Sequence, residues 1–87
     1  MSSADATPIL TAAQCRAARA LLDWSQAALA GAAGVTPGTV RDLEAGVRAP
    51  YAATQAKLRA ALEAAGIVLI ADGALEGAAR RLTGRSE

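Results

Sequence analysis

The segment from Gln26 to Pro50, with the sequence QAALAGAAGVTPGTVRDLEAGVRAP, most constrains what this chain of 87 residues can fold into. It has small or apolar residues wherever two short helices joined by a tight turn must touch. Ala30 falls where the helices would cross, because a larger side chain there would push the backbones apart. Gly34 falls at the turn, where a positive φ is expected and only glycine adopts it without steric cost. The segment therefore predicts two packed helices joined at Gly34.

The second of these helices is expected to have two different faces. Val40 and Leu43, three residues apart, place two branched apolar groups on one side. The residues expected to point away from that side are Pro37, Gly38, Arg41 and Asp42. An outward polar face beside a buried apolar stripe is what a helix needs in order to dock in the major groove of DNA.

This spacing resembles the Cro and phage-repressor type of helix-turn-helix, also called the xenobiotic-response-element (XRE) family, from about Gln14 to about Leu62. The family pattern is Q-x-x-L-A-x-x-x-G-V-T-x-x-T-V-x-x-L-E-x-G-x-R-x-P. The residues that match it are Gln26, Leu29, Ala30, Gly34, Val35, Thr36, Thr39, Val40, Leu43, Glu44, Gly46, Arg48 and Pro50. The resemblance implies a mainly α, four-helix domain that binds double-stranded operator DNA as a homodimer and regulates transcription.

The resemblance also implies which residues approach the bases. The third helix would enter the major groove and present, near its N-terminus, Thr36, Pro37, Gly38, Arg41 and Asp42. The chain departs from the family at Pro37 and Gly38, because neither offers a side-chain hydrogen bond. Arg41 is the best candidate for reading a base, since a guanidinium bound to guanine O6 and N7 contributes roughly 1 to 3 kcal/mol of discrimination. A phosphate or solvent contact is the alternative for Arg41. Asp42 either accepts from cytosine N4 or repels phosphate and orients Arg41.

Phosphate contacts are expected at helix N-termini, which present free N–H groups and a partial positive charge. Ser25 and Gln26 open the second helix, and the resemblance implies that Gln26 donates to a phosphate. Thr36, Thr39 and Arg48 are expected to flank the same DNA strand. Each of these side chains has an alternative role as a helix cap or a solvated group.

Capping residues mark the ends of the predicted helices. Thr11 with Gln14 forms a capping-box pattern, and Ser25 and Thr36 are N-caps. Pro37 suits the first helical position because its missing N–H and fixed φ cost nothing there. The predicted helices span residues 12–23, 26–33, 37 to a stop at Gly46, and 50–65 with a stop at Gly66. The apolar stripe expected on the fourth helix consists of Ala53, Ala56, Leu58, Ala61 and Leu62.

Beyond Gly66 the run Ile67, Val68, Leu69 and Ile70 is rich in β-branched residues and too short for a helix, so it predicts a strand. A lone strand must find a partner. The tail folding back as a hairpin and the same strand of a second subunit are both open, as is a strand that caps the monomer's own core. We expect a dimer, because such a run after a completed helical domain has no obvious sheet to join within so short a chain.

The expected organisation is a flexible N-terminus over residues 1–9, a DNA-binding domain over 10–66, and a strand with a basic tail over 67–87 as the dimerisation element. Residues 74–82 read equally as a short helix or a return strand. Arg80, Arg81 and Arg85 are expected to form a solvated basic end.

Composition argues against catalysis and metal binding. The chain has one cysteine, Cys15, and no histidine, so it lacks an intramolecular disulfide and the commonest base and metal ligand. We therefore expect no enzyme activity, no cofactor and no metal. No signal peptide or apolar run of membrane-spanning length is evident, which predicts a cytoplasmic protein. With no Phe, and Trp24 and Tyr51 as the only aromatic residues, the core must be built from Leu, Val, Ile and Ala.

Charge gives weak support for nucleic-acid binding. The net charge is +1, but residues 9–60 hold six positive side chains against three negative ones. Glu44 is badly placed against the dipole at the end of the third helix, so it should have a cationic partner. We expect this partner to be Arg19, because family members pair the equivalent positions. Cys15 and Trp24 are expected to serve in packing.

Two other functions remain open at this stage. A DNA-binding antitoxin would use the same domain to regulate its operon and its C-terminal strand or tail to mask a toxin. A protein-interaction module would keep the helix-turn-helix scaffold without binding DNA, which Pro37, Gly38 and the small net charge would suit.

Overall fold

The computed structural model describes residues 9–47 and 50–82. Residues 1–8 of the predicted flexible N-terminus lie outside these ranges. Arg48, a predicted DNA contact, and Arg85 of the predicted basic end also lie outside them. The elements in chain order are α1 (Ala12–Leu22), α2 (Gln26–Ala33), α3 (Pro37–Ala45), α4 (Ala52–Ala64), β1 (Ile67–Ala71) and β2 (Glu76–Arg80). The predicted mainly α fold, with four helices followed by a strand or hairpin, is confirmed.

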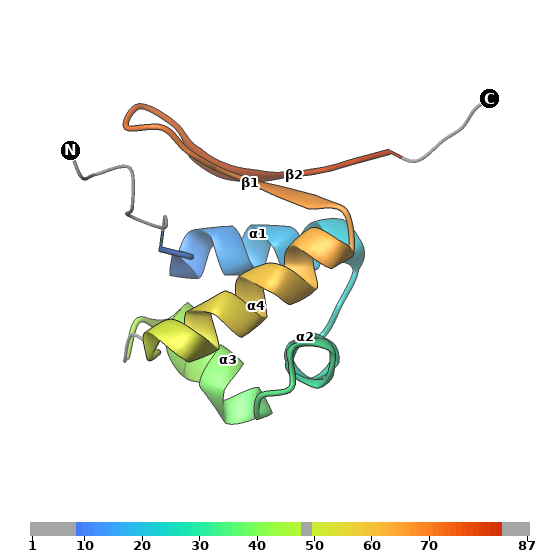
Figure 1. Ribbon diagram of the computed structural model, residues 1–87, viewed down its shortest axis with the longest axis vertical. Coiled ribbons are helices and arrows are strands. Elements are labelled where there is room, and N and C mark those ends of the chain that lie inside the picture. The colour runs from blue at the N-terminus through green and yellow to red at the C-terminus, as the bar shows by residue number, and fades with distance from the viewer. Residues whose placement is uncertain (1–8, 48–49, 83–87) are drawn as a thin grey trace.

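The elements form three layers (Figure 1). The β1–β2 hairpin packs on α1 and α4, while α2 and α3 contact α1 and α4 from the other side. Figure 1 shows the hairpin at the top and α3 at the bottom, with α1 and α4 between them. The hairpin and α3 are therefore on opposite sides of the domain. Among the described helices, none is long and apolar enough to cross a membrane.

Short-range hydrogen bonds set the helix ends as predicted. The Thr11 side chain accepts from the Gln14 backbone N–H and the Gln14 side chain accepts from the Thr11 N–H, which completes the capping box. α1 ends at Leu22, one residue early, because Asp23 has a left-handed φ of 58°. α4 begins at Ala52, two residues late, because Tyr51 is extended with ψ 159°. α4 ends at Ala64, one residue early, and the bounds of α2 and α3 agree with the predicted ones.

The core consists of ten buried apolar residues drawn from all four helices, the preceding turn and β1. They are Leu10, Cys15, Ala18, Leu29, Ala30, Val40, Leu43, Leu58, Leu62 and Ile67. Full burial of a leucine contributes roughly 1.5 to 3 kcal/mol, so the four fully buried leucines supply much of the favourable free energy. Trp24 is half-buried against this core, as expected for a packing role.

The predicted apolar stripe of α4 is wrong at two positions. Leu58 and Leu62 are buried and Ala61 is half-buried, but Ala53 and Ala56 are exposed. The inward side of the first turn of α4 holds Gln55 instead, three residues before Leu58. Its amide accepts from the Leu10 N–H at 2.8 Å and donates to the Leu10 carbonyl at 3.2 Å. A polar side chain that binds both backbone groups of one residue thus replaces apolar contact at this end of α4.

The strand predicted at Ile67 pairs within its own chain. β1 and β2 are antiparallel, with the register running from Ile67 opposite Arg80 to Ala71 opposite Glu76. The segment 74–82 is therefore mainly a return strand. The expectation that this run has no sheet to join within the chain was wrong, because the small residues of β2 give no strong sequence signal for a strand.

The hairpin completes the core of the helical domain. Ile67 is 3 % exposed, and Leu69 and Ala78 pack against the same cluster. The buried Gln14 amide donates to the Ile70 carbonyl at 2.8 Å and to the Gly77 carbonyl at 3.3 Å. The hairpin thus contributes buried residues to the core that the helices form.

Gln14 provides a test of this docking. Gln14→Leu removes the donor to both strands and the acceptor of the Thr11 N–H, and we expect it to lower the free energy of unfolding by about 1 to 3 kcal/mol, the range for a buried polar group left without its partner. Gln14→Glu keeps an oxygen for the Thr11 N–H but aims a carboxylate at two carbonyls, so it should cost more. Urea unfolding and amide hydrogen exchange measure both effects. Wild-type protection of the hairpin amides in both variants would contradict this role.

Candidate nucleic-acid interface

α3 has the two faces that its sequence predicts. Val40 and Leu43 are buried, at 0 % and 6 % exposed. On the other side Pro37 and Arg41 are exposed, and Asp42 is partly exposed. Thr36, Gly38 and Thr39 also reach the surface at the N-terminal end of the helix. The structure therefore brings the six predicted α3 residues to one outward region.

The turn before α3 fixes its direction relative to α2. Ala30 is 1 % exposed where the two helices pack. Its carbonyl accepts from the N–H of Gly34 at 2.9 Å and of Val35 at 3.0 Å. Gly34 has a φ of 75°, the left-handed conformation that the sequence analysis expected. These short-range bonds hold α3 in a fixed orientation on the surface.

Arg41 folds back along α3 over Gly38. A Cβ atom at Gly38 would lie 3.2 Å from Arg41 Nη2 and 3.8 Å from Thr36 Oγ1. The absence of a side chain at Gly38 therefore leaves the space that the guanidinium occupies. One flexible arginine covers the surface at the N-terminal half of the helix, where Pro37 and Gly38 supply no hydrogen-bonding side chain.

Side-chain caps occupy the N-termini of α2 and α3. The Ser25 hydroxyl accepts from the Ala28 N–H at 2.9 Å, and the Thr36 hydroxyl accepts from the Thr39 N–H at 3.2 Å. The hydroxyl oxygens of Thr36 and Thr39 are 3.0 Å apart. These contacts establish the capping role of Ser25 and Thr36.

A buried carboxylate supports α3 from behind. Glu44 receives two hydrogen bonds from Arg19, with Nε 2.6 Å from Oε2 and Nη2 2.7 Å from Oε1. The Glu44 side chain is only 4 % exposed and that of Arg19 20 % exposed. The predicted Arg19–Glu44 pair is confirmed, and it joins α1 to the last turn of α3.

Two further donors complete the Glu44 site. The Cys15 thiol donates to Oε2 and the Gln26 amide donates to Oε1, both at 3.1 Å. Burial by itself raises the pKa of Glu44, but the hydrogen bonds from Arg19, Cys15 and Gln26 outweigh it, so the pKa lies below its usual range. The hydrogen bond to Glu44 raises the pKa of Arg19 in turn. Glu44 is therefore ionised, and its carboxylate links α3 to α1 and α2.

Cys15 is a packing residue with a polar contact. Burial raises the pKa of its thiol to about 12, and the hydrogen bond to Glu44 adds to this effect. The sulfur consequently stays protonated at neutral pH and lacks the thiolate that nucleophilic or redox chemistry needs.

Gln26 and Arg16 have contacts that the sequence analysis did not predict. Gln26 Nε2 donates one of its two N–H groups to Glu44, and the other N–H of the same nitrogen is not part of this bond. Arg16 Nη1 donates to the Glu44 backbone carbonyl at 2.7 Å, at the C-terminal end of α3. Helical spacing was the missed signal, because Cys15 and Arg16 lie four and three residues before Arg19, on the same face of α1.

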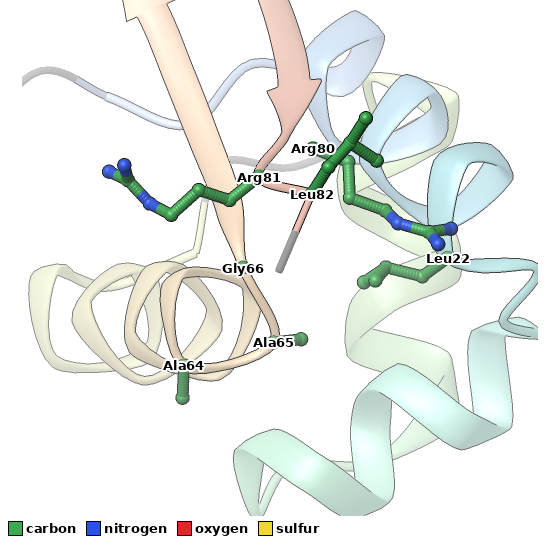
Figure 2. Close-up of a pocket in the computed structure, with 7 residues that line it drawn as sticks. All are labelled: Leu22, Ala64, Ala65, Gly66, Arg80, Arg81 and Leu82. Atoms are coloured by element: carbon green, nitrogen blue, oxygen red, sulfur yellow. The ribbon is translucent and has the colours of Figure 1, made fainter. Parts of the chain in front are cut away.

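An open cavity of about 520 Å³ lies near the end of β2 (Figure 2). It is lined by Leu22, Ala64, Ala65, Gly66, Arg80, Arg81 and Leu82. Figure 2 shows the side chains of Arg80 and Arg81 extending in opposite directions, and Arg80 Nη1 donates to the Leu21 carbonyl at 2.6 Å. None of the predicted DNA contacts lines this cavity.

The described residues contain no group of three or more Cys, His, Asp and Glu side chains placed to hold a metal ion. Within residues 9–47, the short helix α2 is followed by a turn at Gly34 and then by α3. The apolar side of α3 is buried in the core, and Arg41 is exposed on its other side. This arrangement defines a helix-turn-helix protein.

The comparison with known families agrees with this geometry. A helix-turn-helix family model matches residues 16–67, which is more than half of the chain. The chain belongs to the Cro/C1-type helix-turn-helix family, also called the XRE family. Membership supports a DNA-binding regulator. Among curated proteins, none matches the chain.

Proposed function

We propose that this protein is a sequence-specific transcriptional regulator that binds operator DNA as a homodimer. The observation that carries the proposal is the outward face of α3, where Arg41 lies exposed on a helix whose opposite face is fixed in the core. A rigid support behind a flexible cation suits base recognition, because the helix position is set before the DNA is bound.

In the proposed complex the N-terminal half of α3 lies in the major groove. Arg41 reads a guanine, with Pro37, Gly38 and Asp42 facing the groove beside it. Ser25, Gln26, Thr36 and Thr39 contact phosphates near the N-termini of α2 and α3, where backbone N–H groups and the helix dipoles favour anions. Arg48 completes the predicted contact set.

The hydrogen bond from Gln26 to Glu44 supports the phosphate contact. It holds the Gln26 amide nitrogen at the start of α2, and the second N–H of that nitrogen remains to donate to DNA. Glu44 thereby positions Gln26 as well as α3.

The charges of this surface favour two half-sites over one. Arg41 is followed directly by Asp42, so the outward face of α3 gains little net attraction for phosphate from its own charged residues. Two copies linked through the strand Ile67 to Ile70 would each contact one half-site, and the apparent affinity would rise although each copy makes the same contacts as before. A homodimer therefore accounts for specific binding by a sparsely charged helix.

Selection of genomic DNA fragments bound by the purified protein, followed by sequencing and gel-shift titration, tests the proposal. We expect the selected fragments to share two inverted half-sites with centres roughly one helical turn apart, about 10 to 10.5 base pairs or a multiple. Random DNA of equal length is the control. Equal affinity for selected and random fragments would reject operator recognition, and absence of any DNA binding would favour a protein-interaction module.

A further inference from the structure

The hairpin has two edges with unpaired backbone groups. The Arg81 N–H donates to the Gly66 carbonyl and the Asp72 N–H to the Leu75 carbonyl, so the even-numbered residues of β1 form the hydrogen-bonded pairs. The groups that point outward therefore belong to Ile67, Leu69 and Ala71 on β1, and to Glu76, Ala78 and Arg80 on β2. Among the described residues these outward groups have no hydrogen-bond partner.

The two edges differ in charge. β2 has a charged residue at each end, Glu76 and Arg80, and charged residues are a common means of keeping an edge strand from pairing. Both are also engaged by α1, because Glu76 binds the Thr11 hydroxyl and Arg80 binds the Leu21 carbonyl. β1, with the sequence IVLIA, has no charged residue and contains three strong strand formers, Ile67, Val68 and Ile70. Its edge is therefore the one left open to another strand.

We propose that β1 of one copy pairs antiparallel with β1 of a second copy, with the twofold axis beside Leu69, to form a four-stranded sheet. This inference rests on the proposed homodimer and specifies its interface. The register places Leu69 opposite Leu69 of the second copy and Ile67 opposite Ala71, so every outward group of β1 meets a matching one. No like charges meet, which makes the edge self-complementary.

The proposed pairing also joins apolar side chains on the outer face of the sheet. Leu69 faces the core and Val68 is 37 % exposed, so Val68, Ile70 and their cross-strand neighbours Gly77 and Ala79 form the outer face. The twofold axis brings Val68 of one copy opposite Ile70 of the other, twice. Such β-branched pairs each contribute stabilisation across a sheet.

The layered fold favours edge pairing over stacking of the outer faces. α1 and α4 separate the hairpin from α3 (Figure 1), so two hairpins stacked face to face would direct the two α3 helices away from each other. A twofold axis perpendicular to the sheet keeps both α3 helices on the same side. Only that arrangement allows both to contact one DNA duplex.

Cysteine cross-linking distinguishes the two edges. In the proposed pairing residues 68 and 70 of opposite copies form a pair without hydrogen bonds, with Cα atoms about 4.5 Å apart, which suits a disulfide. Under mild oxidation the double variant Val68→Cys/Ile70→Cys should become mostly a covalent dimer. The matched control Gly77→Cys/Ala79→Cys probes the same geometry at the β2 edge, and a Cβ at Gly77 meets no atom within 4 Å. It should remain monomeric on a non-reducing gel.

A charge placed at the edge gives a second measurement that needs no cysteine. Ala71→Lys puts a lysine at the exposed end of β1 twice per dimer, and we expect it to weaken dimerisation roughly tenfold by sedimentation equilibrium. Ala79→Lys, on β2, should have a much smaller effect.

Each outcome decides the proposal. Cross-linking only through residues 77 and 79 would move the interface to β2. A wild-type dimer that neither pair cross-links and that Ala71→Lys leaves intact would exclude the hairpin edges. A wild-type chain that stays monomeric would reject both this interface and the homodimer, whereas the fragment selection described above tests DNA recognition separately.

Discussion

Glu44→Gln is expected to lower the free energy of unfolding by about 2 to 4 kcal/mol at neutral pH, because it leaves the Arg19 guanidinium partly buried without its counter-ion. Arg19→Met should have a similar cost. The Glu44 side chain is only 4 % exposed, and without Arg19 its carboxylate keeps only the Cys15 thiol and the Gln26 amide as donors. The two effects should not add in the double variant, because the second substitution removes a group that has already lost its partner.

The same pair predicts a dependence of stability on pH. The pKa of Glu44 is lower in the folded protein than in the unfolded chain, so the ionised carboxylate stabilises the fold fully above its unfolded pKa of roughly 4.3. This contribution is lost as the pH falls through the lower, folded-state pKa. Glu44→Gln should therefore flatten the acid side of the stability profile.

Urea unfolding of the wild type, both single variants and the double variant between about pH 7 and pH 3 measures these effects. Glu63→Gln is the control for an exposed carboxylate, because Glu63 is 51 % exposed in its 3.1 Å ion pair with Arg59 on α4, whereas Glu44 is 4 % exposed. The Arg59 side chain is 15 % exposed, so the comparison varies the burial of the carboxylate and not that of the guanidinium. Loss of the exposed carboxylate should cost about 0 to 1 kcal/mol. Strict additivity of the two core substitutions would show that Arg19 and Glu44 act independently.

Arg41→Ala is expected to weaken operator binding by about 1 to 3 kcal/mol per half-site and to relax the preference at one base pair of each. The guanidinium is exposed on α3, so the free energy of unfolding should change little. Titration of a complete set of single-base operator variants with wild type and Arg41→Ala measures both affinity and preference.

Arg81→Ala is the control for charge alone. It removes the same charge from an exposed residue that directly follows β2. We expect it to leave the base preferences unchanged. If Arg41→Ala lowers affinity equally for every operator variant, Arg41 contacts phosphate, and sequence reading must come from DNA shape or from the other α3 residues.

The helix ends and the turn were determined by sequence, because the interactions that set them are local. Thr11, Ser25 and Thr36 each bind a backbone N–H three residues later. Gly34 supplies a positive φ that its own lack of a side chain permits. The two faces of α3 follow from helical periodicity in the same way. The Arg19–Glu44 pair, which spans two helices, was predicted through the family resemblance.

Tertiary structure decided the features whose partners are far apart in the chain. β1 pairs with β2 although Gly77, Ala78 and Ala79 have little strand propensity. The pairing is stabilised because Ile67, Leu69 and Ala78 bury apolar surface against the helices. The Gln14 amide bonds carbonyls 56 and 63 residues away. No local pattern encodes such contacts.

The candidate interface shows the same division. Sequence placed Arg41 and Gly38 on one outward face, but only the packed structure shows the guanidinium occupying the space that Gly38 leaves. A packing role for Cys15 was predicted from the sequence, and the structure adds its hydrogen bond to Glu44, 29 residues away. Local backbone geometry follows from neighbouring residues, whereas the partners of buried polar groups are set by how the helices and the hairpin pack together.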